Sequence, residues 1–244
     1  MNRGKVVCSV APTHRFTDSP ILFLICALMI VVMFSGAATA YDAPSLTVGF
    51  DGVVEKNGIP GTWRLLTRTG KADAAAVPDS GTSVMHIKCE GSSFSLEREI
   101  MITTDDFHYL SWTWKALRLP LSGDVRSKER NDQALQLLVA FENGKVLSYV
   151  WDSNAPEGTV ADESIGWPVN IAIRVIVVKS GASDTGKWIT HTRNIYEDYR
   201  NFFKEPPPRV KGVRIQSNTQ YTRDTAEGFV RNIVFSRSLQ ASVR

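Results

Sequence analysis

The chain has 244 residues, with 28 basic and 25 acidic side chains and 43% hydrophobic residues. Residues 1–40 hold three of the basic and one of the acidic side chains, so the rest of the chain has 25 and 24 and a net charge of +1. This balance does not indicate a nucleic-acid or membrane-surface partner. Cys89 is the one cysteine beyond residue 40, which excludes an intramolecular disulfide, and we expect it to be a small buried hydrophobic residue.

The first forty residues have the form of a secretory signal peptide. Positively charged side chains precede an unbroken apolar run at 21–34, and small residues follow at 38–40. The run is shorter than the roughly 20 residues of a spanning helix, so we expect cleavage after Ala40 rather than a membrane anchor. The sequence thus predicts an exported, periplasmic protein with a signal at 1–40 and a single domain at 41–244.

Short strands are predicted along the first part of this domain. Apolar residues alternate with polar ones, or cluster between Gly and Pro, at 46–50, 62–68, 83–89, 93–100 and 107–117. We expect 83–89 and 93–100 to form a hairpin around Gly91, and Trp112 and Trp114 to face the core. The intervening stretches 70–81 and 119–131 are predicted to be loops.

The strongest local signal is an Asn-Gly pair at 143–144 between two apolar runs. It favours a two-residue type I′ turn, in which both central residues have positive φ. With that register, Gln136 lies opposite Trp151 and shares a face with Tyr149. Both faces of this hairpin are mostly apolar, which predicts a central hairpin covered on both sides.

The last part of the chain adds strands and one short helix. We expect a loop at 153–170 and strands at 171–178, 187–192, 210–216 and 228–235. Asn194 is a suitable N-cap for a helix near 195–203, which the prolines at 206–208 end. About ten short strands and a minor helix predict an all-β fold, an antiparallel two-sheet jelly-roll sandwich.

Five blocks of residues, in this order along the chain, resemble an exported bacterial family known as a domain of unknown function. The resemblance implies a β-sandwich similar in shape to carbohydrate-binding and lectin-like jelly rolls, and it implies no catalytic residues. The family pattern has a histidine near Tyr221, so its absence here argues against histidine chemistry at that loop. The blocks are Leu-Ser-Trp-Thr-Trp (110–114), Asn-Asp-Gln-Ala (131–134), Leu-Ser-Tyr-Val-Trp (147–151), Arg-Asn-Ile-Tyr-Glu-Asp-Tyr (193–199) and Gly-Val-Arg-Ile-Gln (212–216).

The first candidate site is an aromatic platform for a sugar. Aromatic faces stack on pyranose rings, and nearby polar groups bind the hydroxyls. Trp151, Gln136 and Tyr149 suit this role by register, and Trp167 lies in a Pro/Gly-rich loop that could close over them. The alternative is that these aromatic side chains pack in the core of a central strand.

A second candidate is a charged group at the ends of the hairpin. Asp132 opens one strand and Asp152 ends its partner, so both carboxylates should lie at one end of the sheet, with Arg174 and Arg193 as candidate partners. An Arg–carboxylate pair there would be structural. The functional alternative is a clamp for an acidic sugar or another carboxylate, in which Arg193 and Asp132 are polar neighbours of the platform.

A third candidate is a structural calcium ion, the one cofactor that we consider. Jelly-roll domains hold calcium with oxygen ligands between the first and last strands. Asp51 lies at a suitable place, and Asp224 or Glu227 could join it. No EF-hand loop or compact acidic ladder supports this site.

Catalytic patterns are sparse. A lyase needs a base beside groups that neutralise a uronate, and Arg214, Gln216 and Tyr221 are the available set. Glu97 and Glu99 share a strand face, as a glycosidase would need, but their charged surroundings indicate a solvated edge. No nucleophile elbow, phosphate loop or zinc spacing is found.

These observations favour a non-catalytic carbohydrate-binding or envelope-associated module, whose partner is a glycan or an envelope component. The alternatives are a polysaccharide-active enzyme of lyase type and a structural module that binds a protein. The sequence gives no indication of the oligomeric state.

Overall fold

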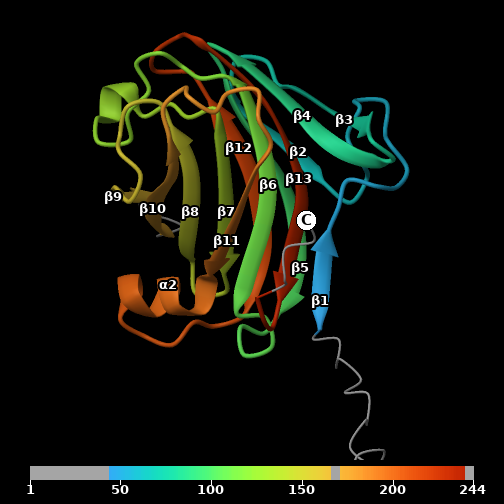
Figure 1. Cartoon of the computed structure of the whole chain (residues 1–244), viewed down its shortest axis with the longest axis vertical. Coiled ribbons are helices and arrows are strands. Elements are labelled where there is room, and N and C mark those ends of the chain that lie inside the picture. The colour runs from blue at the N-terminus through green and yellow to red at the C-terminus, as the bar shows by residue number, and fades with distance from the viewer. Residues whose placement is uncertain (1–43, 166–170, 240–244) are drawn as a thin grey trace, which may run out of the picture. The chain divides into compact units, whose positions relative to one another are not determined.

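The computed structural model describes residues 44–165 and 171–239 (Figure 1). The predicted signal peptide therefore lies outside the described residues. The described residues all fall in one compact unit. Its strands are β1 (Ser45–Val48), β2 (Arg64–Thr69), β3 (Asp73–Asp79), β4 (Thr82–Glu90), β5 (Ser93–Ile102), β6 (Tyr109–Arg118), β7 (Leu135–Phe141), β8 (Lys145–Asp152), β9 (Val160–Ile165), β10 (Ile171–Ser180), β11 (Ile189–Asn194), β12 (Val210–Asn218) and β13 (Thr225–Ser236).

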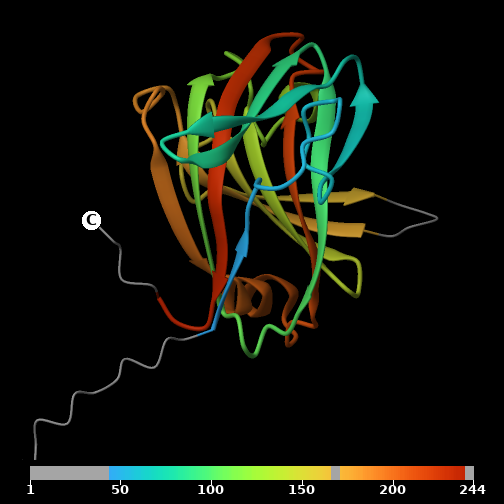
Figure 2. The same ribbon diagram turned by 90° about the vertical axis from the view of Figure 1, so that its right-hand side faces the viewer.

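The strands form two sheets that pack face to face, as predicted. One sheet has six strands in the order β11-β6-β13-β4-β3, with β1 also paired to β13. The other has seven strands in the order β2-β5-β12-β7-β8-β10-β9. Figure 2 shows the two layers from the side, with the short helix at one end of them. One pair, β8 with β10, is parallel, so the seven-stranded sheet is mixed rather than purely antiparallel.

Local signals placed the helix correctly. Helix α2 spans Ile195–Phe203, and the side chain of Asn194 accepts a hydrogen bond from the backbone N–H of Glu197 at 3.0 Å. This bond satisfies a donor at the first turn that has no partner within the helix. The helix ends at Lys204, which adopts the left-handed conformation before the prolines. A 3-10 turn, η1, spans Lys128–Arg130.

Several predictions in the first half of the chain were wrong. Residues 70–81 are not a loop, because β3 pairs with β4 through a turn at Ser80-Gly81. Both turn residues have positive φ, so the type I′ geometry occurs here. The alanines and Pro78 are not typical of a strand, so the sequence did not indicate one here. Pro78 is tolerated because β3 is an edge strand. The predicted hairpin of β4 and β5 is also wrong, because the two strands lie in different sheets.

Two predicted loops contain more structure than expected. The stretch 153–170 holds β9, which pairs with β10 and forms an edge of the seven-stranded sheet. The stretch 119–131 is not fully solvated: Asp124 and Val125 are buried in it. Val125 packs in a small apolar cluster with Val150 and Val175 on the outer face of the seven-stranded sheet.

The register of the central hairpin differs from the prediction by one residue. Gly144 donates to the carbonyl of Phe141 and has a φ of 79°, and Asn143 is not among the residues with positive φ. This is the geometry of a three-residue loop, in which a tight turn is followed by a glycine in the left-handed region. Because the loop has one residue more than predicted, Gln136 pairs with Val150 and Leu135 pairs with Trp151. The hairpin is nonetheless central and almost wholly buried, as expected.

Aromatic side chains join the two sheets at the centre of the core. Trp112 and Trp114 of β6 are fully buried, as predicted. The ring of Trp112 stacks on Tyr149 of β8 with centroids 5.1 Å apart, and Trp114 lies 6.3 Å from Trp151. Cys89 is buried in the same core, which confirms that prediction.

Replacing Trp151 should test this contact. We expect Trp151→Ala to lower the free energy of unfolding by about 3–5 kcal/mol, because a large ring leaves a cavity in a close-packed core. Urea denaturation followed by circular dichroism would measure the change. Tyr221→Ala is the control, since that side chain is 52% exposed and its loss should cost less than about 1 kcal/mol. Equal stability of the wild type and the Trp151 variant would contradict this assignment.

A histidine beside the two tryptophans predicts a dependence of stability on pH. The ring of His191 lies 5.4 Å from Trp112 and from Trp114, and burial lowers the pKa of His191 from 6.5 to about 4. Between these two values the unfolded chain holds a proton that the folded chain lacks. Stability should therefore fall as the pH falls from 6.5 to about 4, at up to about 1.4 kcal/mol per pH unit from this residue.

The measurement is the difference between the pH profiles of the wild type and His191→Gln. The variant should lose this slope, whereas His86→Gln, which removes a histidine from the sheet surface, should keep it. Parallel profiles for the wild type and the His191 variant would contradict the prediction.

Candidate functional site

The predicted aromatic platform does not exist as an exposed surface. Tyr149 and Trp151 point into the core and are fully buried, whereas Gln136 points to the outer face of the same sheet. The one-residue change in register separates the amide from the two rings. Gln136 instead donates to the side-chain oxygens of Gln133 and Asn218. Trp167 lies outside the described residues.

Tyr149 and Arg193 do meet, but in a buried structural cluster. The Tyr149 hydroxyl donates to Asp198 at 2.8 Å, and the Arg193 guanidinium donates to both oxygens of the same carboxylate, at 2.8 and 2.5 Å. Burial, together with the neighbouring Asp198 carboxylate, raises the pKa of Tyr149 well above its usual value. This cluster fixes α2 against β8 and β11, and it occupies the Arg193 guanidinium with a carboxylate of the protein itself.

Asp132 and Asp152 organise loops rather than form the predicted ion pair with arginine. Asp132 accepts hydrogen bonds from the backbone N–H groups of Tyr221 and Thr222, at 3.1 and 2.6 Å. Asp152 accepts three backbone N–H bonds, one of them from Val125 at 2.9 Å. The arginines have other partners: Arg193 pairs with Asp198, and Arg174 pairs with Asp162.

The proposed calcium ligands are not brought together. Asp51 is exposed, whereas Asp224 accepts from the backbone of Leu121 and Glu227 contacts His86. Within residues 44–165 and 171–239, no group of three or more His, Cys, Asp or Glu side chains has the geometry to hold a metal ion.

An open groove of about 670 Å³ lies on the outer face of the seven-stranded sheet. It has the size of a ligand pocket, for which roughly 300–1,000 Å³ is typical. The outward residues of several neighbouring strands line it, because side chains alternate between the core and the outer face. Leu138, Ala140, Val146 and Ile173 form its apolar part. Phe141 also lines the groove, but its side chain is buried in the core.

The polar part of the groove is centred on Glu97. This carboxylate, on β5, lies between Arg64 of β2, at 2.7 Å, and Arg214 of β12. A smaller hollow of about 280 Å³ shares Arg214 and is lined also by Gln216 and Ser95. Arg214 therefore borders both hollows, and their donors and acceptors suit a polar ligand with many hydroxyl groups.

Sequence reasoning found part of this set. Arg214 and Gln216 were named for a lyase, and both point outward from β12 as their alternation indicates. Tyr221, named with them, is absent from the residues that line either hollow. Glu97 was assigned to a solvated edge, yet its side chain is only 15% exposed because two arginines cover it. Arg64 was missed, since nothing in the sequence pairs β2 with β5.

Comparison with known proteins places the chain in a family. Residues 62–234 match the family described as "Protein of unknown function (DUF3047)", and the chain belongs to it. A search of curated proteins finds no match.

None of the helices in the described part of the chain has the length and apolar character needed to cross a membrane.

Several solved structures are similar to this chain. A family 11 carbohydrate-binding module of a cellulase from Clostridium thermocellum is 12% identical with a TM-score of 0.41, covering 82% of this chain and 98% of that chain. The xyloglucanase domain of an effector from Sinorhizobium fredii is 11% identical with a TM-score of 0.43, covering 69% and 89%. A family 11 xylanase from Neocallimastix patriciarum is 12% identical with a TM-score of 0.38, covering 79% and 96%.

The loop role of Asp132 can be tested by removing its carboxylate. We expect Asp132→Ala to lower the free energy of unfolding by about 1–3 kcal/mol, because the backbone donors of Tyr221 and Thr222 lose their acceptor. Asp51→Ala is the control, since Asp51 is exposed and its change should stay within about 0.5 kcal/mol. Chemical denaturation measures both variants, and similar losses in the two would argue against this role.

Proposed function

We propose that this protein is a non-catalytic carbohydrate-binding module that holds a glycan chain in the groove on the outer face of the seven-stranded sheet. The observation that carries the proposal is the cluster of Arg64, Glu97 and Arg214 beside an apolar floor in an open groove of about 670 Å³. We further propose that the chain is exported and meets its glycan, or an envelope component that carries one, outside the cytoplasm. Support for export comes from the sequence of residues 1–40.

The chemistry of the groove suits the hydroxyl groups of a sugar. The Glu97 carboxylate accepts hydrogen bonds, the two guanidinium groups donate them, and the Gln216 amide of the adjoining hollow does both. The two arginines hold the carboxylate in place, so it is oriented before a ligand arrives. The partly exposed apolar side chains of Ala140 and Ile173 offer contact for the C–H faces of a sugar ring.

A lyase is the less favoured alternative. Arg214 and Gln216 lie on one strand face, as neutralisation of a uronate requires, but the proposed base is not with them. The side chain of Tyr221 is 52% exposed, and its backbone N–H binds Asp132. Release of unsaturated uronates, measured by ultraviolet absorbance on acidic polysaccharides, would support this alternative instead.

Arg214→Ala tests the groove. The protein is purified after expression of the full-length chain and screened against an array of neutral and acidic glycans, and calorimetry gives the affinity for any glycan that binds. We expect the substitution to weaken binding of a neutral glycan at least tenfold, because Glu97 loses the arginine that orients it and the sugar loses a donor.

Arg118→Ala is the matched control. It removes the same charge from the other sheet, where Arg118 pairs with Asp224, and should leave the affinity unchanged. The proposal would be overturned by a folded wild-type protein that binds no glycan, or by a folded Arg214 variant with the wild-type affinity.

A further inference from the structure

A row of aromatic and cationic side chains crosses the outer face of the six-stranded sheet. Lys115 of β6 pairs with Phe229 of β13, and Phe229 pairs with His86 of β4. Trp188, immediately before β11, lies beside Lys115. Lys115, Phe229 and His86 point away from the core, because their chain neighbours Trp114, Val230, Met85 and Ile87 are buried. Trp188 joins them through its contact with Lys115. We call these four side chains the aromatic row.

Contacts between rings and cations hold the row together. The ammonium of Lys115 lies 4.6 Å from the ring centre of Trp188 and 4.8 Å from that of Phe229. The guanidinium of Arg231 lies 4.0 Å from the ring centre of Trp188. His86 stacks on Phe229 with centroids 4.7 Å apart. Such contacts are stabilising by about 0.5–1 kcal/mol each at exposed sites, so they orient the side chains without burying them.

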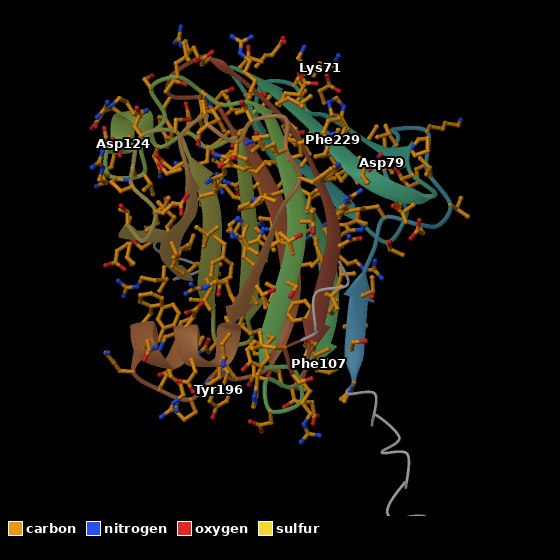
Figure 3. The ribbon with its side chains drawn as sticks, in the orientation of Figure 1. Lys71, Asp79, Phe107, Asp124, Tyr196 and Phe229 are labelled. Carbon is orange, nitrogen blue, oxygen red and sulfur yellow. The ribbon has the colours of Figure 1, made fainter. Side chains whose placement is uncertain are left out.

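The charges along the row are not all neutralised. Arg231 donates to Asp79 at 2.7 Å, and His86 contacts Glu227 at 2.8 Å. Phe229 and Asp79 are labelled in Figure 3. Among the described residues, Lys115 has no carboxylate within ion-pair distance; the two aromatic rings are its neighbours. The row therefore offers one uncompensated cation between two partly exposed aromatic faces.

The position of Trp188 is fixed by the turn that precedes it. The backbone N–H of Gly186 donates to the carbonyl of Ala116 at 2.7 Å, which joins the turn to β6. Within the turn, Asp184 accepts from Lys179 and Lys187, and these hydrogen bonds lower the pKa of Asp184 to about 2. These contacts link the turn to the end of β10. The row is built on strands and a braced turn, as a preorganised site requires.

We propose that the aromatic row is a second binding surface, which takes a chain of uronate sugars. A uronate has a carboxylate, which can pair with Lys115, and an apolar ring face, which can contact the exposed parts of the Trp188 and Phe229 rings. The row spans about 14 Å, from three spacings of about 4.8 Å between strands, which is long enough for a short oligosaccharide. The paired hydroxyls of Thr113 and Thr190, 2.8 Å apart beside the row, add partners for sugar hydroxyls.

This surface is independent of the groove. It lies on the other sheet, and it uses no groove residue. It selects a negative charge through Lys115, whereas the two arginines at the centre of the groove are already paired with Glu97. A neutral glycan in the groove and an acidic one on the row would let one domain join two kinds of polysaccharide.

The test measures binding of polygalacturonate oligosaccharides by calorimetry, with the full-length chain as the expressed form. Methyl-esterified polygalacturonate is the matched ligand, because esterification removes the charge and keeps the ring. We expect Lys115→Gln to weaken binding of the acidic oligosaccharide at least tenfold. We also expect the wild type to bind the esterified ligand more weakly, with no further loss on Lys115→Gln.

Matched variants separate this surface from the rest of the protein. Lys128→Gln removes an exposed lysine in η1 and should leave the affinity unchanged. Trp188→Ala should abolish binding; if it unfolds the domain, Lys115→Gln decides the question. Arg214→Ala should keep its affinity for the acidic oligosaccharide. A failure of the groove proposal can therefore be distinguished from a failure of this one. Absence of polygalacturonate binding by the folded wild type, or wild-type affinity in folded Lys115→Gln, would overturn the proposal.

Discussion

The contact between Trp112 and Tyr149 is the constraint on which the rest of the structure depends. The two rings come from different sheets and stack at 5.1 Å, so they set how the layers meet. The hydroxyl of the same tyrosine reaches Asp198, whose carboxylate also holds Arg193. One residue thus fixes both the packing of the sheets and the place of α2. A buried hydroxyl, a carboxylate and a guanidinium are stable together here because each satisfies the others.

The two outer faces of the sandwich differ in how loops cover them. On the seven-stranded sheet, Asp152 draws a loop over the strands by accepting the N–H of Val125, and Val125 then packs on Val150 and Val175. Burial raises the pKa of Asp152, although three backbone N–H groups oppose this effect. The groove is the part of this face that the loop leaves uncovered. The described loops leave the aromatic row on the other sheet partly exposed, and its side chains contact one another.

The local features of the fold could be predicted from the sequence, and the long-range ones could not. The cap at Asn194 and the alternation around Trp112 and Trp114 act within a few residues, so the helix and most strands were predicted correctly. The turn at Asn143-Gly144 was recognised, but the loop has one residue more than predicted. Gln136 therefore lies on the side of the sheet opposite to Tyr149 and Trp151, not on the same side. Pairing between distant strands leaves no local pattern, and it is this pairing that brings Arg64 to Glu97.

The same limit explains why the aromatic row was not foreseen. Alternation along β6 puts Lys115 on the face opposite Trp114, but its two aromatic neighbours come from β13 and from the turn before β11. Alternation along β13 indicates that Phe229 and Arg231 share one face, opposite Val230. That signal identifies a polar and aromatic face, and only the pairing with β6 makes it a continuous row.

The place of the last strand has a consequence for how the chain reaches its native state. β13 pairs with β6, β4 and β1, so it lies at the centre of the six-stranded sheet although it is made last. That sheet therefore cannot be completed before residues 225–236 have been synthesised. Contacts this distant in sequence form slowly, because closing the long loop between them costs entropy first. The six-stranded sheet therefore depends on a strand close to the C-terminal end of the described residues.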